Sequence, residues 1–276
     1  MLLRPIPFCC RSDQIQLVVM FELNGIRVVR DGRVILSVPS LTIPATELTV
    51  VLGHNGSGKS TLVDLLAGQT RPDQGEILLN NKNLTGYTKR ELAQQVAFLP
   101  QKLPVSAGLT VRELVSLGRF PWRGTFGRRH PEDNIIISQA MESAGVTEFA
   151  QIPADNLSGG ERQRAWVAML LAQQSPVLIL DEPTSALDIH HQYQLMRLLQ
   201  DLNRTQRTGI IVILHDLNLA LQYATHIIAL KKGKVAFEGN AALLEDETRL
   251  SGLYETAIRL IPHPDTEQRK VAVVCN

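Results

Sequence analysis

One glycine-rich segment limits the possible fold of this chain more than any other feature. The apolar, β-branched run Leu48–Leu52 before it predicts a buried strand, and the run Lys59–Ala67, which ends before Gly68, predicts a helix. A strand, a glycine turn and a helix in this order form a phosphate-binding loop, because backbone N–H groups and the helix dipole converge on one anion. The predicted nucleotide-binding residues are Gly53, His54, Asn55, Gly56, Ser57, Gly58, Lys59, Ser60 and Thr61.

Two residues of this loop have distinct chemical roles. The ammonium group of Lys59 is predicted to reach the β- and γ-phosphates of the nucleotide, and the hydroxyl of Ser60 to ligate Mg²⁺. The flanking strand and helix make an incidental glycine turn a poor explanation of the pattern. The segment therefore predicts a nucleoside triphosphate site.

A second buried strand supplies carboxylates to the same site. The run Val177–Leu180 is apolar throughout, which indicates a central strand covered on both faces. Asp181 and Glu182 follow at its carboxyl end, where parallel sheets place their ligands. We expect Asp181 to hold Mg²⁺ and Glu182 to orient and polarise an attacking water. Without the phosphate loop, two carboxylates at a strand end would be unremarkable.

Two further polar residues directly follow apolar runs. His215 follows the run Ile210–Leu214, and Gln101 follows the run 97–100. At such a position an imidazole can bridge the γ-phosphate and the attacking water, and an amide can touch both metal and water. Alone, His215 would be a structural histidine and Gln101 a solvated loop residue. Beside the other motifs, both are predicted to be catalytic, and Gln101 also a metal ligand.

A second glycine turn opens a helix far from the first. Ser158 is followed three residues later by Glu161, which is the spacing of a capping box. Gly159 and Gly160 are therefore expected at a helix N-terminus, which offers N–H donors and a positive dipole to an anion.

Taken in order and spacing, these motifs resemble the ATP-binding cassette (ABC) ATPase family over residues 21–250. The resemblance implies an α/β fold: a P-loop NTPase core with a mostly parallel sheet, an N-terminal antiparallel β piece and an inserted helical subdomain. The corresponding family motifs are Walker A (Gly53–Thr61), the Q-loop (Gln101), the signature (Leu157–Glu161), Walker B (Val177–Glu182), the D-loop (Ser185–Asp188) and the switch histidine (His215).

The resemblance also implies an assembly and a reaction. Family members form head-to-tail homodimers with two ATP molecules and Mg²⁺ at the interface, so Ser158, Gly159 and Gly160 would contact the γ-phosphate bound by the partner. The family further implies an integral-membrane permease and, indirectly, a periplasmic or lipoprotein substrate-binding protein. The expected location is the cytoplasmic face of the bacterial inner membrane, with ATP hydrolysis driving transport.

One family element is missing from this sequence. Many members stack adenine on an aromatic residue roughly 29 positions before the lysine of the phosphate loop, whereas the equivalent window here, Ile26–Asp31, has no aromatic side chain. The guanidinium plane of Arg30 could stack on the base instead. We therefore expect Arg30 to contact the nucleotide and base discrimination to be weak.

Composition and chain organisation are those of a globular enzyme. Charged residues make up 20% and the net charge is +1, so nothing favours a nucleic-acid partner. No apolar run approaches the ~18 residues that span a bilayer. We expect an N-terminal appendage at 1–20, with Met20 as an alternative start, an ATPase domain at 21–260 whose helical subdomain covers about 102–157, and a tail at 261–276.

A basic and aromatic stretch, 119–130, narrows the resemblance and leaves alternatives open. It is interpreted either as a solvated loop with Trp122 in the core, or as a surface that docks a permease with Trp122 and the arginines as anchors. The segments 118–122 and 53–55 resemble ATPases of iron–siderophore, haem and cobalamin importers. The nearest resemblance is to the ATPase of ferric hydroxamate importers, and it lies in the segments 99–104, 110–115, 158–169, 185–189 and 261–264. A ferric hydroxamate is thus the expected cargo, with haem or cobalamin import and a soluble ABC ATPase as alternatives.

Overall fold

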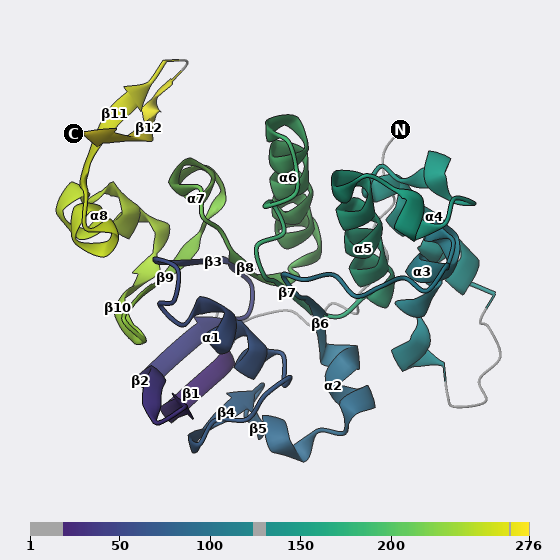
Figure 1. The fold of residues 1–276 in the computed structure, drawn as a ribbon, viewed down its shortest axis with the longest axis horizontal. Coiled ribbons are helices and arrows are strands. Elements are labelled where there is room, and N and C mark those ends of the chain that lie inside the picture. Colours follow the sequence, from purple (N-terminus) through teal and green to yellow (C-terminus); the bar gives the residue numbers. More distant parts are fainter. Residues whose placement is uncertain (1–18, 124–130, 265, 276) are drawn as a thin grey trace, which may run out of the picture.

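The computed structural model describes residues 19–123, 131–264 and 266–275 of the chain. Its strands form a six-stranded sheet, a four-stranded sheet and a two-stranded hairpin (Figure 1). The predicted appendage and the end of the 119–130 stretch lie largely outside the described residues.

The six-stranded sheet carries the predicted motif strands side by side. Its order is β10-β9-β3-β8-β7-β6; the strands from β9 to β6 pair in parallel, and β10 is antiparallel to β9. Every residue of β3, β7 and β8 is buried, as expected for strands covered on both faces. The bounds are β3 Leu48–Leu52, β6 Val96–Leu99, β7 Val177–Leu180, β8 Gly209–Ile213, β9 His226–Lys231 and β10 Lys234–Asn240.

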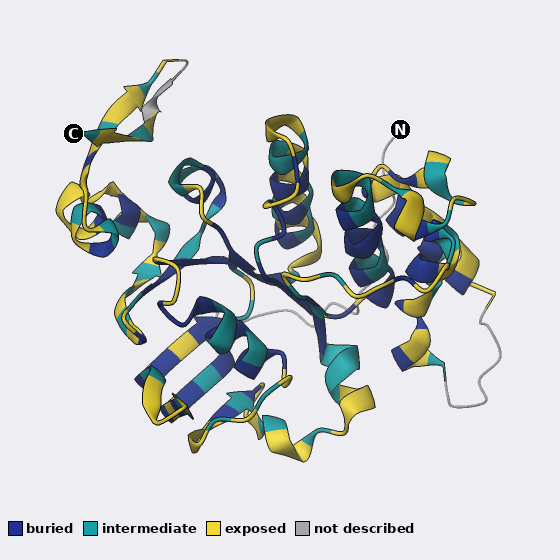
Figure 2. Cartoon of the chain, viewed as in Figure 1, coloured by how far each residue is buried: buried dark blue, intermediate teal, exposed yellow. Residues whose placement is uncertain are grey.

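The two faces of this sheet belong to different hydrophobic cores. Successive strand residues alternate between them: Val50 lies in the core shared with the helices above the sheet, and Val51 in the core below it (Figures 1 and 2). The upper helices are α5 Gly159–Gln173, α6 Ile189–Gln206, α7 Leu217–Tyr223 and α8 Glu247–Tyr254.

Below the sheet, the phosphate-loop helix packs against an antiparallel sheet. Helix α1 (Lys59–Leu66) contributes Leu62 and Leu66 to the lower core, together with Phe21 and Leu36 of the antiparallel strands. This arrangement confirms the predicted α/β fold with its N-terminal antiparallel piece. The sheet order is β2-β1-β4-β5, with bounds β1 Val19–Arg30, β2 Arg33–Pro44, β4 Gln74–Leu79 and β5 Lys82–Asn83, and helix α2 (Lys89–Gln95) follows.

Helices α3 and α4 pack on α5 at one side of the molecule (Figure 1). Their bounds are α3 Val111–Leu117 and α4 Asp133–Ser143. The buried carboxylate of Asp133 accepts from Arg119 Nε and from Arg123 Nε, both at 2.9 Å. Single 3₁₀ turns complete the connections at η1 Leu84–Gly86, η2 Phe120–Trp122, η3 Thr147–Phe149 and η4 Ala154–Asn156.

The ion pairs at Asp133 change the interpretation of the basic stretch. Arg119 is buried and bonded internally, and Arg123 shares its carboxylate, so these two arginines are structural groups and not the free docking anchors that the second interpretation required. Trp122 is 37% exposed, and its indole N–H donates to Gln173 O at 2.6 Å. Trp122 is therefore neither a core residue nor a free side chain. Residues 124–130 lie outside the described part.

The C-terminal segment has more regular structure than a tail. After the 3₁₀ turn η5 (Ala241–Glu245) and helix α8, the strands β11 (Ala257–His263) and β12 (Thr266–Cys275) form an antiparallel hairpin. The hairpin begins before the expected boundary at residue 261. Asn218 of α7 holds it through two bonds to Ala272, with Ala272 N donating to Asn218 Oδ1 at 2.8 Å.

Candidate nucleotide site

The phosphate loop has the backbone geometry that an anion cradle needs. Gly53, Gly56 and Gly58 have φ values of 143°, 76° and 98°, a region that side chains disfavour. A side chain at Gly53 would also overlap the Leu230 carbonyl. Helix α1 starts after Gly58 with no side-chain cap, which leaves its first N–H groups available to a ligand.

Lys59 lies buried inside this loop. Its side chain Nζ donates to Gly53 O at 2.8 Å and to His54 O at 3.0 Å. Burial lowers the pKa of the ammonium group, while the charges of Glu182 and Asp181 oppose that shift. These contacts hold the positive charge of Lys59 inside the loop, close to the carboxylates of Glu182 and Asp181.

Asp181, at the end of β7, fits a divalent cation. It is 4% exposed, and its Oδ1 has no hydrogen-bond partner among the described residues. Burial raises the pKa of this carboxyl to about 6, against a hydrogen bond from Ser60. A buried oxygen without a partner, beside a serine hydroxyl, is the oxygen donor set that Mg²⁺ prefers. The residues present therefore fit the predicted metal.

Glu182 is the meeting point of three strand ends. Its Oε2 accepts from Gln101 Nε2 at 2.7 Å, and its Oε1 lies 2.5 Å from His215 Nε2. Gln101 follows β6, Glu182 follows β7 and His215 follows β8, so the parallel sheet brings together residues that are far apart in the sequence. Glu182 also has φ 52°, a left-handed backbone that is sparsely populated outside glycine and is common at functional sites.

The signature residues form the predicted capping box. This capping box does not contact the phosphate loop of the same chain. Glu161 N donates to Ser158 Oγ at 3.3 Å and Ser158 N to Glu161 Oε2 at 2.9 Å, which is a complete capping box. Nearest to Gly159 and Gly160 is the turn at Ala186 and Leu187. None of the hydrogen bonds described for 158–160 reaches residues 53–61, and α5 and α1 lie on opposite faces of the sheet (Figure 1).

Arg30 lies at the exposed end of β1. Its Nη1 donates to Val29 O at 3.0 Å and lies 3.9 Å from Asp73 Oδ2. In the pairing of β1 with β2, Arg30 lies opposite Arg33. Two residues further along β2, the backbone carbonyl of Ile35 lies close to Gly58 of the phosphate loop. Arg30 is thus near the loop in the fold, and its contact with a base stays a prediction.

Two contacts of the nucleotide site and its surroundings were not predicted from the sequence. The ring of His54 makes an edge contact with Tyr254 of α8 at 5.6 Å between centroids. Gln163 of α5 donates to Pro183 O at 2.6 Å, which ties the signature helix to the turn after Glu182. Both contacts join segments that are far apart in the sequence, so only the tertiary structure could reveal them.

A comparison with protein families identifies the chain. A family model described as ABC transporter matches residues 36–185, more than half of the sequence. The chain belongs to the ABC transporter family. The cassette is accordingly an ATP-binding and ATP-hydrolysing subunit. Among its described residues, no helix is long and apolar enough to cross a membrane.

Curated relatives of this ABC cassette are similar over most of its length. The iron(3+)-hydroxamate import ATP-binding protein FhuC of Bacillus subtilis is 40% identical over 86% of this chain and 88% of its own. The ferric enterobactin transport ATP-binding protein FepC of Escherichia coli is 38% identical over 82% and 83%. The hemin import ATP-binding protein HmuV of Rhodococcus jostii is 40% identical over 90% and 84%.

Solved structures share the fold of the cassette. A bacterial ABC transporter cassette solved as a dimer has a TM-score of 0.73 at 29% identity, covering 80% of this chain and 99% of its own. The same cassette is known as a dimer in a post-hydrolysis state with ADP and phosphate, with a TM-score of 0.72.

Proposed function

We propose that this cassette hydrolyses ATP to power the import of a ferric siderophore of the hydroxamate type through a membrane permease. The observation that carries the proposal is the contact of Glu182 with Gln101 and His215 beside the phosphate loop, since it assembles a site for hydrolysis. The cargo is supported by the similarity to a hydroxamate import protein, because cargo does not contact the nucleotide site.

The proposed mechanism assigns one task to each residue. Residues Gly53–Thr61 cradle the phosphates of ATP, and Lys59 leaves its carbonyl partners to neutralise the β- and γ-oxygens. Ser60 and Asp181 would hold Mg²⁺, which when bound neutralises phosphate charge. Glu182 polarises a water for in-line attack on the γ-phosphate. Gln101 and His215 orient that water and stabilise the developing charge.

The site of one chain lacks donors from the signature, which suggests a second copy. In the proposed homodimer, Ser158, Gly159 and Gly160 of the partner chain approach the γ-phosphate from the open side. Ser158 and Gly159 at the N-terminus of α5 are exposed, which supports this role because the N–H groups and dipole of a helix N-terminus favour an anion. One solved cassette of the same fold is a dimer in two structures.

The proposed partners follow from the import role. A permease would dock on the side of α3 and α4, where Phe120 is 70% exposed and Trp122 keeps part of its ring exposed. A periplasmic or lipoprotein substrate-binding protein would deliver the cargo, and the cassette would work at the cytoplasmic face of the inner membrane. No role for nucleic acid is proposed.

Haem is the second candidate cargo, because the hemin import proteins of Rhodococcus jostii and Streptomyces coelicolor match 90% of this chain. Uptake assays in cells separate the two. Cells with the wild-type chain or with Glu182→Gln would receive ⁵⁵Fe-labelled hydroxamate and catecholate siderophores, haem and labelled cobalamin. Loss of hydroxamate uptake alone is the expected result. Unchanged iron uptake with lost haem or cobalamin uptake would overturn the cargo and leave the ATPase intact.

A further inference from the structure

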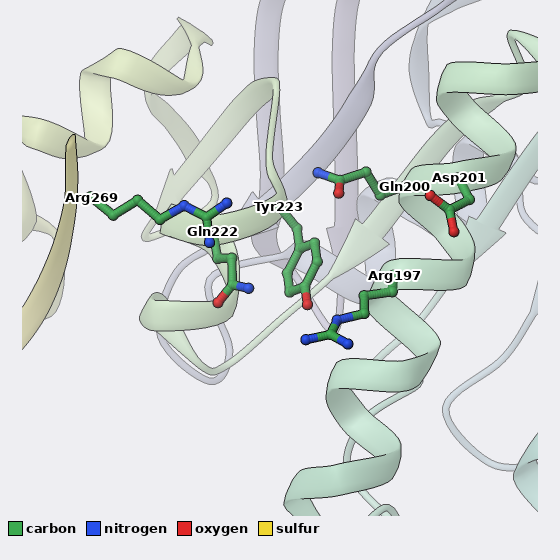
Figure 3. Close-up of a pocket in the computed structure, with 6 residues that line it drawn as sticks. All are labelled: Arg197, Gln200, Asp201, Gln222, Tyr223 and Arg269. Atoms are coloured by element: carbon green, nitrogen blue, oxygen red, sulfur yellow. The ribbon is translucent and has the colours of Figure 1, made fainter. Parts of the chain in front are cut away.

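An open polar cavity lies on the upper side of the sheet between α6, α7 and β12, among residues that have no part in the nucleotide site (Figure 3). Its volume is about 290 Å³. Three of the lining residues come from α6, two from α7 and one from the C-terminal hairpin: Arg197, Gln200, Asp201, Gln222, Tyr223 and Arg269.

The polar groups of this cavity are not used by the fold. Arg197 and Arg269 form no ion pair within the described part of the chain, and the amides of Gln200 and Gln222 make no hydrogen bond there. Tyr223 is 2% exposed, yet its hydroxyl has no partner among the described groups. A buried hydroxyl without a partner is unfavourable, so it marks a place where a ligand or water completes the bonding.

Side chains of α6 and β12 extend toward the space beside Tyr223. Figure 3 shows the hydroxyl of Tyr223 directed toward the guanidinium of Arg197, with Arg269 reaching in from β12 beside Gln222. An edge contact with Tyr193, at 6.2 Å between ring centroids, supports the Tyr223 ring. The lining holds two guanidinium groups and one carboxylate, that of Asp201, so it carries an excess of positive charge.

We propose that this cavity binds a small oxyanion, a phosphate or carboxylate group, through Arg197, Arg269 and the hydroxyl of Tyr223. Guanidinium groups donate paired hydrogen bonds to such anions, and the tyrosine adds one further donor. Gln200 and Gln222 supply amide donors at the sides.

The position of the cavity gives binding a structural consequence. Helix α6 begins after the D-loop and α7 begins two residues after His215, while β12 is attached to α7 through Asn218 and Ala272. An anion held by Arg197 and Arg269 would join α6 to the C-terminal hairpin. It would therefore stabilise the folded cassette by mass action, since the unfolded chain has no such site.

Thermal unfolding and calorimetry of the full chain test the proposal with inorganic phosphate and, in parallel, citrate. A saturating non-hydrolysable ATP analogue and Mg²⁺ in excess over citrate are present throughout, so that the γ-phosphate position of the phosphate loop is already occupied and added phosphate cannot bind there beside ADP. We expect a saturable rise in Tm and a saturable heat of binding for at least one anion. Arg197→Gln and Arg269→Gln should each weaken that binding about tenfold or more, because each removes a charged donor.

Two further variants make the outcome specific. Arg204→Gln removes an exposed arginine of the same helix outside the cavity, and it should bind the anion as the wild type does. Tyr223→Phe should leave the anion-free protein at least as stable, because it removes an unpartnered buried hydroxyl, yet weaken anion binding several-fold.

Two results would contradict the proposed anion site. A rise in Tm that does not saturate and is shared by every variant is the general salt effect of excluded anions, and it would overturn the site. Saturable binding that Arg197→Gln, Arg269→Gln and Tyr223→Phe all retain would overturn it as well. Comparison of phosphate with citrate distinguishes a phosphate ligand from a carboxylate ligand. ATP hydrolysis by Arg197→Gln without added anion should match that of the wild type.

Discussion

At the residue scale, buried charges dominate the nucleotide site. Lys59, Asp181 and Glu182 come from two different segments, and each is held at low exposure by the sheet and the phosphate loop. Charges buried this deeply act strongly on one another because water does not screen them. Three predictions belong to this scale.

Lys59→Ala should abolish measurable nucleotide binding. The ammonium group is the only charged donor of the loop segment 53–61, and a charged hydrogen bond to phosphate contributes about 2–3 kcal/mol, or roughly 100-fold in affinity. Equilibrium binding of a fluorescent ATP analogue measures the loss, and Lys89→Ala, at an exposed site on α2, serves as the matched control. Retained affinity in Lys59→Ala would remove Lys59 from the phosphate site.

Asp181 should make the nucleotide-free protein less stable as pH rises from about 4 to about 6. Its pKa is raised from 3.8 to about 6, so over this window the folded state binds the proton that the unfolded state releases. The shift corresponds to roughly 2–3 kcal/mol. Urea unfolding at several pH values should show this decline in the wild type and a smaller one in Asp181→Asn. Equal slopes in both proteins would contradict the assignment.

The first strand predicts weak discrimination between bases. Its window has no aromatic side chain, and the guanidinium plane of Arg30 is the group predicted to stack on the base. We expect affinities for ATP and GTP within about tenfold of each other, because stacking alone recognises every base. Competition binding with the two nucleotides measures the ratio. A large preference for ATP would show that hydrogen bonds to adenine come from elsewhere.

At the element scale, buried ion pairs and caps fix the helices that surround the sheet. Asp133 at the start of α4 binds two arginines from the segment after α3, and thereby joins these helices. Removing one partner of a buried pair leaves an uncompensated charge, which is more unfavourable than losing a surface pair.

Asp133→Ala should therefore lower the free energy of unfolding by about 3–5 kcal/mol. Glu245→Gln removes a surface partner of Lys270 and should change it by about 1 kcal/mol or less. Chemical denaturation of both variants measures the two effects. A small effect of Asp133→Ala would mean that Arg119 and Arg123 find solvent or other acceptors.

At the scale of the whole molecule, one chain presents half of each proposed reaction site. The phosphate loop and the capping box of α5 face different surroundings, so a complete site would need two copies. The α/β fold and the family do not depend on this proposal, whereas the complete site proposed for hydrolysis does.

Glu182→Gln should bind ATP, hydrolyse it about 10²–10⁴-fold more slowly and accumulate as a closed dimer. The neutral amide keeps the shape of the side chain but removes the group that polarises water. Phosphate release measures turnover, and size-exclusion chromatography with ATP and Mg²⁺ measures the dimer. Normal hydrolysis would overturn Glu182 as the general base, and slow hydrolysis by a monomer would overturn the dimer.

The sequence by itself determined the motif strands, the phosphate loop and the caps, because these depend on local patterns. A short apolar run such as Val177–Leu180 is typical of a strand buried on both faces, and the glycine spacing and the pair Ser158 and Glu161 act within a few residues. The same local signals did not predict that residues after 260 belong to a hairpin, or that Arg119 is buried.

Only the tertiary structure decided which groups meet. The contacts of Glu182 with Gln101 and His215 require the strand order β8-β7-β6, and the contact of His54 with Tyr254 and the cavity at Tyr223 require the packing of distant helices. No pattern within a short window encodes such contacts. They arise because burying the two faces of one sheet brings remote segments to the same edge.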